Sequence, residues 1–204
     1  MDFIKNSEPI MICDIGAAPS DKTDFIDDLF TNTNSKLVGF EPNPDEFRKL
    51  KNVNKKKFYN FAIGDGEEKI KKSLVLQLET SPTPLYKDEK SSAQILKKLE
   101  ELGFALHMFN KVKTQCFRPM VLNNNPDIGL NYLFQLDCVL VRNFREIKNL
   151  SSEQLKKLIL IMFYSFKSYD FVDFLIVRLD ELENSKFIND YRDLLKLLKF
   201  NKIY

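Results

Sequence analysis

Acidic residues close two short apolar segments near the N-terminus, and their spacing suits a small polar ligand. Asp14 lies at the end of the segment 10–15, and Glu41 directly follows the segment 36–40. The carboxylate of Glu41 can accept hydrogen bonds from both hydroxyls of a ribose, and the carboxylate of Asp14 can accept from an ammonium group. Gly16 lets the backbone pass close to a ligand. These residue types predict a ligand crevice near the N-terminus.

The framework for this crevice follows from the apolar pattern. Residues 10–15 are continuously apolar up to their acid, which is typical of a parallel-sheet strand buried on both faces. Segments 36–40 and 58–63 indicate two further strands. A helical stripe covers 21–30, and a second helix begins at Pro44 with Asn43 as its cap. The alternation predicts an α/β fold with a Rossmann-like, doubly wound and mostly parallel sheet.

Ligands of such sheets bind beyond the carboxyl ends of the strands. A third strand end, 62–65, lies beside the two acidic ones. A nicotinamide dinucleotide needs the Gly-x-Gly-x-x-Gly turn for its pyrophosphate, whereas Gly16 is followed here by Ala17-Ala-Pro-Ser20. S-adenosylmethionine carries no phosphate, so one close-approach glycine flanked by acids suits it better. The predicted binding residues are Asp14, Gly16, Glu41, Pro42, Asn43, Ala62 and Ile63.

Purely structural interpretations of these motifs stay open. An acid that ends a strand before a glycine is common turn chemistry, and the segment 64–66 alone is more typical of a turn than of a site. The acid after the next strand is what favours binding.

The second half of the chain predicts three more strands and several helices. The strands are 74–79, 104–109 and 133–141, the helices begin with 91–102, and 110–132 is predicted to be a loop. From Ser151 onward the pattern is helical, and Ser151 forms a capping box with Gln154 at the start of the first helix. An apolar stripe follows this cap, and two further helices are predicted over 171–182 and 187–198.

We therefore predict a Rossmann-like domain over 1–145 and a helical extension over 146–204. The extension is interpreted as a helical cap on the domain. The alternative is a surface for a homo-oligomer or for a partner such as a glycan-modifying enzyme.

Composition narrows the class of protein. Lysine and arginine number 31 against 29 acids, so the net charge of +2 does not favour nucleic acid as a partner. No apolar run approaches the roughly 18 residues of a membrane span, and the first five residues are not typical of a signal peptide. Three cysteines are too few for a disulfide framework or a zinc cage. We expect a cytoplasmic protein with no metal and no membrane partner.

Three stretches resemble the FkbM family of S-adenosylmethionine-dependent methyltransferases. They are Asp14-Ile-Gly-Ala-Ala-Pro-Ser20, Gly39-Phe-Glu-Pro-Asn-Pro44 and Asn60-Phe-Ala-Ile-Gly-Asp65. The similarity resumes at 74–79 and continues to 137–142. The resemblance implies O-methylation of a hydroxyl on a sugar or a related metabolite. It also implies that Glu41 holds the ribose, Asp14 and Gly16 the methionine end, and Ala62 and Ile63 the edge of the adenine.

The chain departs from this family between the third strand and 74–79. Family members carry a fourth strand there, roughly Lys-Ile-Asp-x-x-Gly-x-Glu, beside the methyl donor, whereas only 64–73 makes the connection here. A parallel crossover takes a dozen or more residues and usually a helix. We therefore expect a bare link without a covering helix. Either the sheet lacks one strand, or 58–63 and 74–79 form an antiparallel hairpin.

The catalytic base is not assigned from the sequence. His107, Glu79 and Asp137 are weak candidates with structural alternatives, and Cys13 is interpreted as a packing residue. The primary hypothesis is an FkbM-type O-methyltransferase acting on a small-molecule or glycan hydroxyl. The alternative is a degenerate, non-catalytic domain that serves binding or assembly.

Overall fold

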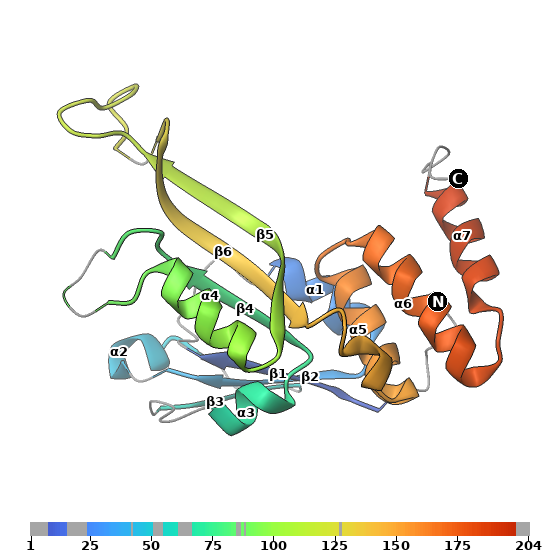
Figure 1. Cartoon of the computed structure of the whole chain (residues 1–204). Coiled ribbons are helices and arrows are strands. Elements are labelled where there is room, and N and C mark those ends of the chain that lie inside the picture. Colours follow the sequence, from blue (N-terminus) through green and yellow to red (C-terminus); the bar gives the residue numbers. More distant parts are fainter. Residues whose placement is uncertain are drawn as a thin grey trace. The chain divides into compact units, whose positions relative to one another are not determined.

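The chain forms two compact units. The computed structural model describes residues 8–15, 24–41, 43–50, 55–60, 67–84, 87, 89–126 and 128–198. The first unit comprises 1–66 and 150–204, and the second comprises 67–149 (Figure 1). The predicted division lay at residue 145, whereas here the C-terminal helices group with the N-terminal sheet and the middle of the chain stands as its own unit.

The first unit contains the parallel sheet. Its strands are β1 (Ile10–Ile15), β2 (Ser35–Phe40) and β3 (Lys56–Tyr59), in the order β1-β2-β3. Helix α1 (Asp24–Asn32) connects the first two strands, and the short α2 (Pro44–Phe47) lies between the second and third. This β-α-β-α-β order confirms the predicted α/β class over the N-terminal part of the chain.

Helix α1 packs on the sheet through its apolar side. Ile26 and Leu29 are buried, as is Leu37 of β2, which helix α1 contacts. Because side chains alternate along a strand, Ile10 shares this face of β1 with Ile12 and Asp14. Burying a leucine side chain contributes roughly 1.5–3 kcal/mol, so this layer fixes the helix on the sheet.

Three C-terminal helices complete the first unit. They are α5 (Ser152–Tyr164), α6 (Tyr169–Glu183) and α7 (Phe187–Leu197), packed in sequence, with α5 also against α1. The capping box of Ser151 and Gln154 is present at the start of α5, as predicted. Their buried side chains form the largest apolar core of this unit: Leu155, Leu158, Ile159, Met162, Val172, Leu175, Ile176, Leu179, Tyr191 and Leu195. No helix in the described part of the chain is long and apolar enough to cross a membrane.

A single carboxylate organises the turn between α6 and α7. Asp180 accepts hydrogen bonds from the Ser185 hydroxyl at 2.6 Å and from the backbone N–H groups of Phe187 at 2.9 Å and Ile188 at 3.0 Å. The last two N–H groups belong to the first turn of α7, where no helical partner exists for them. Asp180 therefore links two helices through the unsatisfied end of one of them.

The second unit is an antiparallel sheet with helices on one face. Its strands are β4 (Val75–Thr80), β5 (Phe104–Gln115) and β6 (Tyr132–Arg142), in the order β4-β6-β5, with β6 antiparallel to both neighbours. The helices are α3 (Glu67–Lys72), α4 (Ser92–Glu101) and a short 3₁₀ turn, Ile147–Asn149. Figure 1 shows α4 along the sheet.

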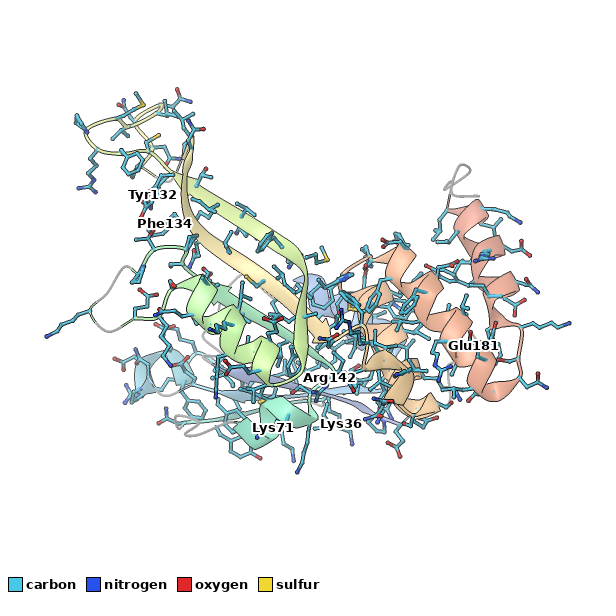
Figure 2. The ribbon with its side chains drawn as sticks, viewed as in Figure 1. Lys36, Lys71, Tyr132, Phe134, Arg142 and Glu181 are labelled. Carbon is cyan, nitrogen blue, oxygen red and sulfur yellow. The ribbon has the colours of Figure 1, made fainter. Side chains whose placement is uncertain are left out.

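The core of the second unit lies between α4 and the central strand. Leu99 of α4 packs with buried residues of the sheet, and partly buried residues of α3, α4 and β4 surround them. At one end of the sheet, the Arg142 guanidinium lies 4.5 Å from the Phe104 ring centroid and donates to the carbonyl of Lys71. Figure 2 shows Arg142 and Lys71 together at this end.

Two sequence-based predictions about the second half are wrong. Residues 110–115, predicted as a loop, continue β5, because a ribbon exposed on both faces lacks the apolar run used to recognise a strand. The link 64–73 does carry a helix, α3, because the chain leaves the parallel sheet here and starts a second sheet. The hairpin alternative is also excluded, since β3 pairs with β2 and β4 pairs with β6. The parallel part of the sheet is thus three strands, smaller than predicted.

We predict that Asp180→Ala lowers the free energy of unfolding by about 1–3 kcal/mol, because three donors lose their acceptor. Urea denaturation followed by circular dichroism measures this change. The matched control is Asp193→Ala in α7, whose carboxylate pairs with Lys196 at 2.8 Å on the surface and should contribute within about 0.5 kcal/mol. Equal effects of the two substitutions would contradict the role given to Asp180.

Candidate functional site

The ends of β1 and β2 bring the two predicted acids to one edge of the parallel sheet. Asp14 is paired in register with Gly39, and Ile15 with Phe40, so Glu41 follows immediately beyond the last pair. Alternation along β2 gives Glu41 the same face as Gly39 and therefore as Asp14. Gly39 contributes no side chain between them. The sequence-based prediction that these two strand ends meet is confirmed.

Glu41 is buried and held by several backbone contacts. Only 5% of its surface is exposed, and its Oε1 accepts a hydrogen bond from the backbone N–H of Asn43 at 2.7 Å. Its own N–H donates to the carbonyl of Tyr59 in β3 at 3.1 Å. A buried carboxylate is costly unless charge or hydrogen bonds compensate it. Glu41 is therefore a preorganised carboxylate at a strand end.

Asp14 shares the electrostatic environment of Glu41. Burial is the main cause that raises the pKa of Asp14, and the negative charge of Glu41 raises it further. In the strand register, Asp14 lies opposite Gly39 and Glu41 comes two residues later in the neighbouring strand, so two like charges lie at adjacent strand ends. Such a pair is relieved when a cation approaches or when one member is protonated. The geometry thus favours a ligand that brings positive charge.

The remaining predicted binding residues fall into two groups. Asn43 is described: it is the N-cap of α2, its Oδ1 accepts from the N–H of Asp45 at 2.9 Å, and its N–H binds Glu41. Its side chain thus serves the helix, and its backbone serves the site. Gly16, Pro42, Ala62 and Ile63 lie outside the described residues.

Sequence analysis missed one residue that supports the site. The side-chain amide of Asn60, directly after β3, donates to the backbone carbonyl of Glu41 at 2.8 Å. The contact ties the ends of β2 and β3 together. The local sequence held no signal for this contact, because β3 reads Lys-Lys-Phe-Tyr and the predicted strand 58–63 ran through Asn60. The role of Asn60 depends on the pairing of β3 with β2 and not on the separation of the two residues in the sequence.

The opposite face of β1 is open to solvent. Met11 and Ile15 are 62% and 66% exposed, and Cys13 between them is exposed as well. The interpretation of Cys13 as a packing residue is therefore wrong. Helices α1 and α2 both connect parallel strands of one sheet, and right-handed connections place both on a single face. Of the C-terminal helices of this unit, α5 packs against α1, and Met11 and Ile15 stay exposed on the other face of β1.

The candidates for a catalytic base lie in the second unit. Glu79 of β4 and Asp137 of β6 are directly opposite each other, and Lys111 of β5 faces Asp137 from the other side. His107 of β5 lies 6.3 Å, between ring centroids, from Phe144 in an edge-on arrangement. The described residues contain no group of three or more metal-ligating side chains.

Chemically, the edge formed by Asp14 and Glu41 offers carboxylate acceptors and negative charge. That combination suits hydroxyls and a cationic group. No protein-family model, no curated protein and no solved structure matches the chain.

We predict that Asp14→Asn stabilises the first unit at neutral pH. With its raised pKa, Asp14 binds more protons in the folded than in the unfolded state, so its contribution to stability falls as pH rises from its ordinary value through the raised one. Asparagine removes this cost. Thermal melts should show a melting temperature a few degrees above that of the wild type at pH about 7, and no gain at pH about 3, where both forms are neutral. A destabilised variant at neutral pH would contradict the repulsion.

Proposed function

We propose that the chain binds S-adenosylmethionine at the edge formed by Asp14 and Glu41 and acts as an FkbM-type O-methyltransferase. The acceptor would be a hydroxyl of a sugar or a related metabolite. The observation that carries the proposal is the buried Glu41 carboxylate beside a second carboxylate at neighbouring ends of parallel strands. The resemblance of the segments 14–20, 39–44 and 60–65 to the FkbM family supports the same assignment.

The charge of the ligand fits the charge of this edge. S-adenosylmethionine has a sulfonium and an ammonium against one carboxylate, so it brings net positive charge to two carboxylates that repel each other. Glu41 would accept hydrogen bonds from the ribose hydroxyls, and Asp14 would accept from the ammonium group. Binding of a cation lowers the pKa of Asp14, so affinity should rise with pH through the raised pKa of this residue.

Transfer needs the acceptor oxygen in line with the methyl carbon. When bound, S-adenosylmethionine supplies an electrophilic methyl group on a sulfonium sulfur. In the proposal, Glu41 and Asp14 hold and orient the donor, and they do not take the proton of the acceptor hydroxyl. We assign no catalytic base.

We predict that Glu41→Gln raises the dissociation constant for S-adenosylmethionine at least about ten-fold, measured by isothermal titration calorimetry. Hydrogen bonds to a charged acceptor contribute roughly 1.5–3 kcal/mol. Glutamine keeps an oxygen that can accept from the N–H of Asn43, so the turn should survive. The matched control is Asp45→Asn in α2, whose exposed carboxylate pairs with Arg48 at 2.9 Å and should leave affinity unchanged. Unchanged affinity in the Glu41 variant would overturn the assignment of the site.

A second candidate function is a non-catalytic domain that retains part of the crevice. The outer edge of β1, where a fourth parallel strand of a methyltransferase sheet would pair, has no strand neighbour among the described residues. The chain instead continues into an antiparallel sheet. This observation favours loss of the part of the site that lies beside the methyl donor.

Titration separates the two candidates. Binding in the micromolar range that the Glu41 variant weakens supports the methyltransferase, and a methyl-transfer assay with sugar acceptors then follows. Absence of binding at millimolar ligand by a wild-type chain with a cooperative melt would leave the non-catalytic candidate.

A further inference from the structure

The end of the β5–β6 ribbon carries a concentrated group of exposed apolar side chains. Beyond β4, whose pairing with β6 stops at Leu136, only two strands and their connecting loop continue. Figure 1 shows this ribbon extending past α4 and β4, and Figure 2 places Tyr132 and Phe134 on its distal part. We call the following residues the apolar tip: Phe117, Met120, Val121, Ile128, Leu130 and Leu133, each at least 38% exposed.

The apolar tip has a defined backbone. Leu122 and Asn125 form a two-residue hairpin turn, closed by a 2.8 Å hydrogen bond, with Asn123 and Asn124 at positive φ as a type I′ turn requires. A second turn joins the carbonyl of Phe117 to the N–H of Met120 at 3.1 Å. Side chains on a fixed loop lose little further entropy when they enter a contact.

The returning strand of the loop is pinned to β5. The N–H of Leu130 donates to the carbonyl of Gln115 at 3.4 Å, and Gly129 lies against the backbone of Thr114 with no room for a Cβ. The apolar tip therefore exposes large apolar side chains to water on a backbone that is fixed by hydrogen bonds. Phe117, Met120 and Leu130 line one hollow of the surface, and exposed apolar side chains gathered in this way mark a contact surface.

Positive charge borders the apolar tip. Lys111 and Arg118 are exposed and Lys113 is partly exposed, whereas the sequence between Phe104 and Leu136 holds one carboxylate, Asp127, and Asp137 lies opposite Lys111. The same positive charge disfavours tip-to-tip association of two copies. An apolar end with an excess of basic over acidic residues matches the interface of an anionic bilayer, where apolar groups enter the acyl boundary and cations remain among the headgroups.

Single-stranded nucleic acid fits the apolar tip less well. Base stacking needs free aromatic faces, whereas the rings of Phe117 and Tyr132 lie on each other at 4.8 Å and Lys113 lies 5.8 Å from the Phe134 ring centroid. Most tip residues are aliphatic. The hollow between Phe117, Leu130 and Tyr132 encloses about 220 Å³, below the usual 300–1,000 Å³ of a small-molecule site. Its size favours a shallow contact over a dedicated ligand pocket.

We propose that the apolar tip anchors the protein to the surface of membranes that contain anionic lipids. This is a peripheral contact, distinct from the membrane span that the sequence excluded, and it revises the expectation of no membrane partner. It does not depend on the proposed methyl transfer.

Vesicle sedimentation with the full chain tests the anchor. We expect binding to vesicles of phosphatidylglycerol and phosphatidylcholine, weak binding to phosphatidylcholine alone, and release by high salt. The double variant Phe117→Ser, Leu130→Ser should lower the partition coefficient at least about ten-fold, because two apolar side chains no longer enter the bilayer. The matched control is Phe174→Ser in α6, which is 50% exposed in the other unit and should bind as the wild type does.

A spectroscopic test uses the absence of tryptophan from the sequence. Phe117→Trp places a single indole in the apolar tip, and its emission should shift to shorter wavelength with anionic vesicles only. The proposal is overturned if the protein ignores anionic vesicles at low salt, or if the tip variants bind like the wild type. It is equally overturned if the indole responds to single-stranded RNA or to protein concentration and not to vesicles.

Discussion

The packing of α1 between the parallel sheet and α5 is the constraint on which the first unit depends. A sheet of three short strands cannot bury enough apolar surface alone, so Ile26 and Leu29 of α1 must cover one face. The C-terminal helices then extend that layer through α5 and α6. Because α1 determines which face of β1 and β2 is covered, it also determines the face on which Asp14 and Glu41 lie. The packing of α1 on the sheet thus fixes both the fold of this unit and the face that carries the candidate site.

The candidate site keeps a cost that packing does not remove. Glu41 is buried beside a partly buried Asp14, and the negative charge of the first opposes ionisation of the second. A protein selected only for stability would replace one of these acids with a neutral residue. Backbone contacts from Asn43 and Tyr59 hold Glu41 in place in spite of this repulsion. A buried carboxylate that is held in place beside a second acid is the arrangement that the proposed cationic ligand would use.

The sequence predicted individual strands and helix starts well, and it predicted less well which elements lie next to one another. Continuous apolar runs identified β1 and β2, and the capping box at Ser151 identified a helix start, because both signals lie within a few residues. The meeting of Asp14 and Glu41 followed from the rule for parallel strand ends. The support from Asn60, the exposure of Cys13 and the length of β5 depend on which elements lie alongside. Nothing in the local sequence specifies that neighbourhood.

The link between the two sheets does not by its length decide their strand directions. Because β3 ends at Tyr59 and β4 begins at Val75, residues 60–74 connect them, and they include helix α3. A connection of this length with a helix would suffice for a parallel crossover. The chain instead enters an antiparallel sheet, in which β4 pairs with β6 and β6 pairs with β5 within their own unit. The consequence is chemical as well as structural: the edge of β1 that a methyltransferase closes with its fourth strand has no strand neighbour in the described part of this chain. In the proposed function, the carboxylates at the ends of β1 and β2 therefore hold the methyl donor without a fourth strand beside them.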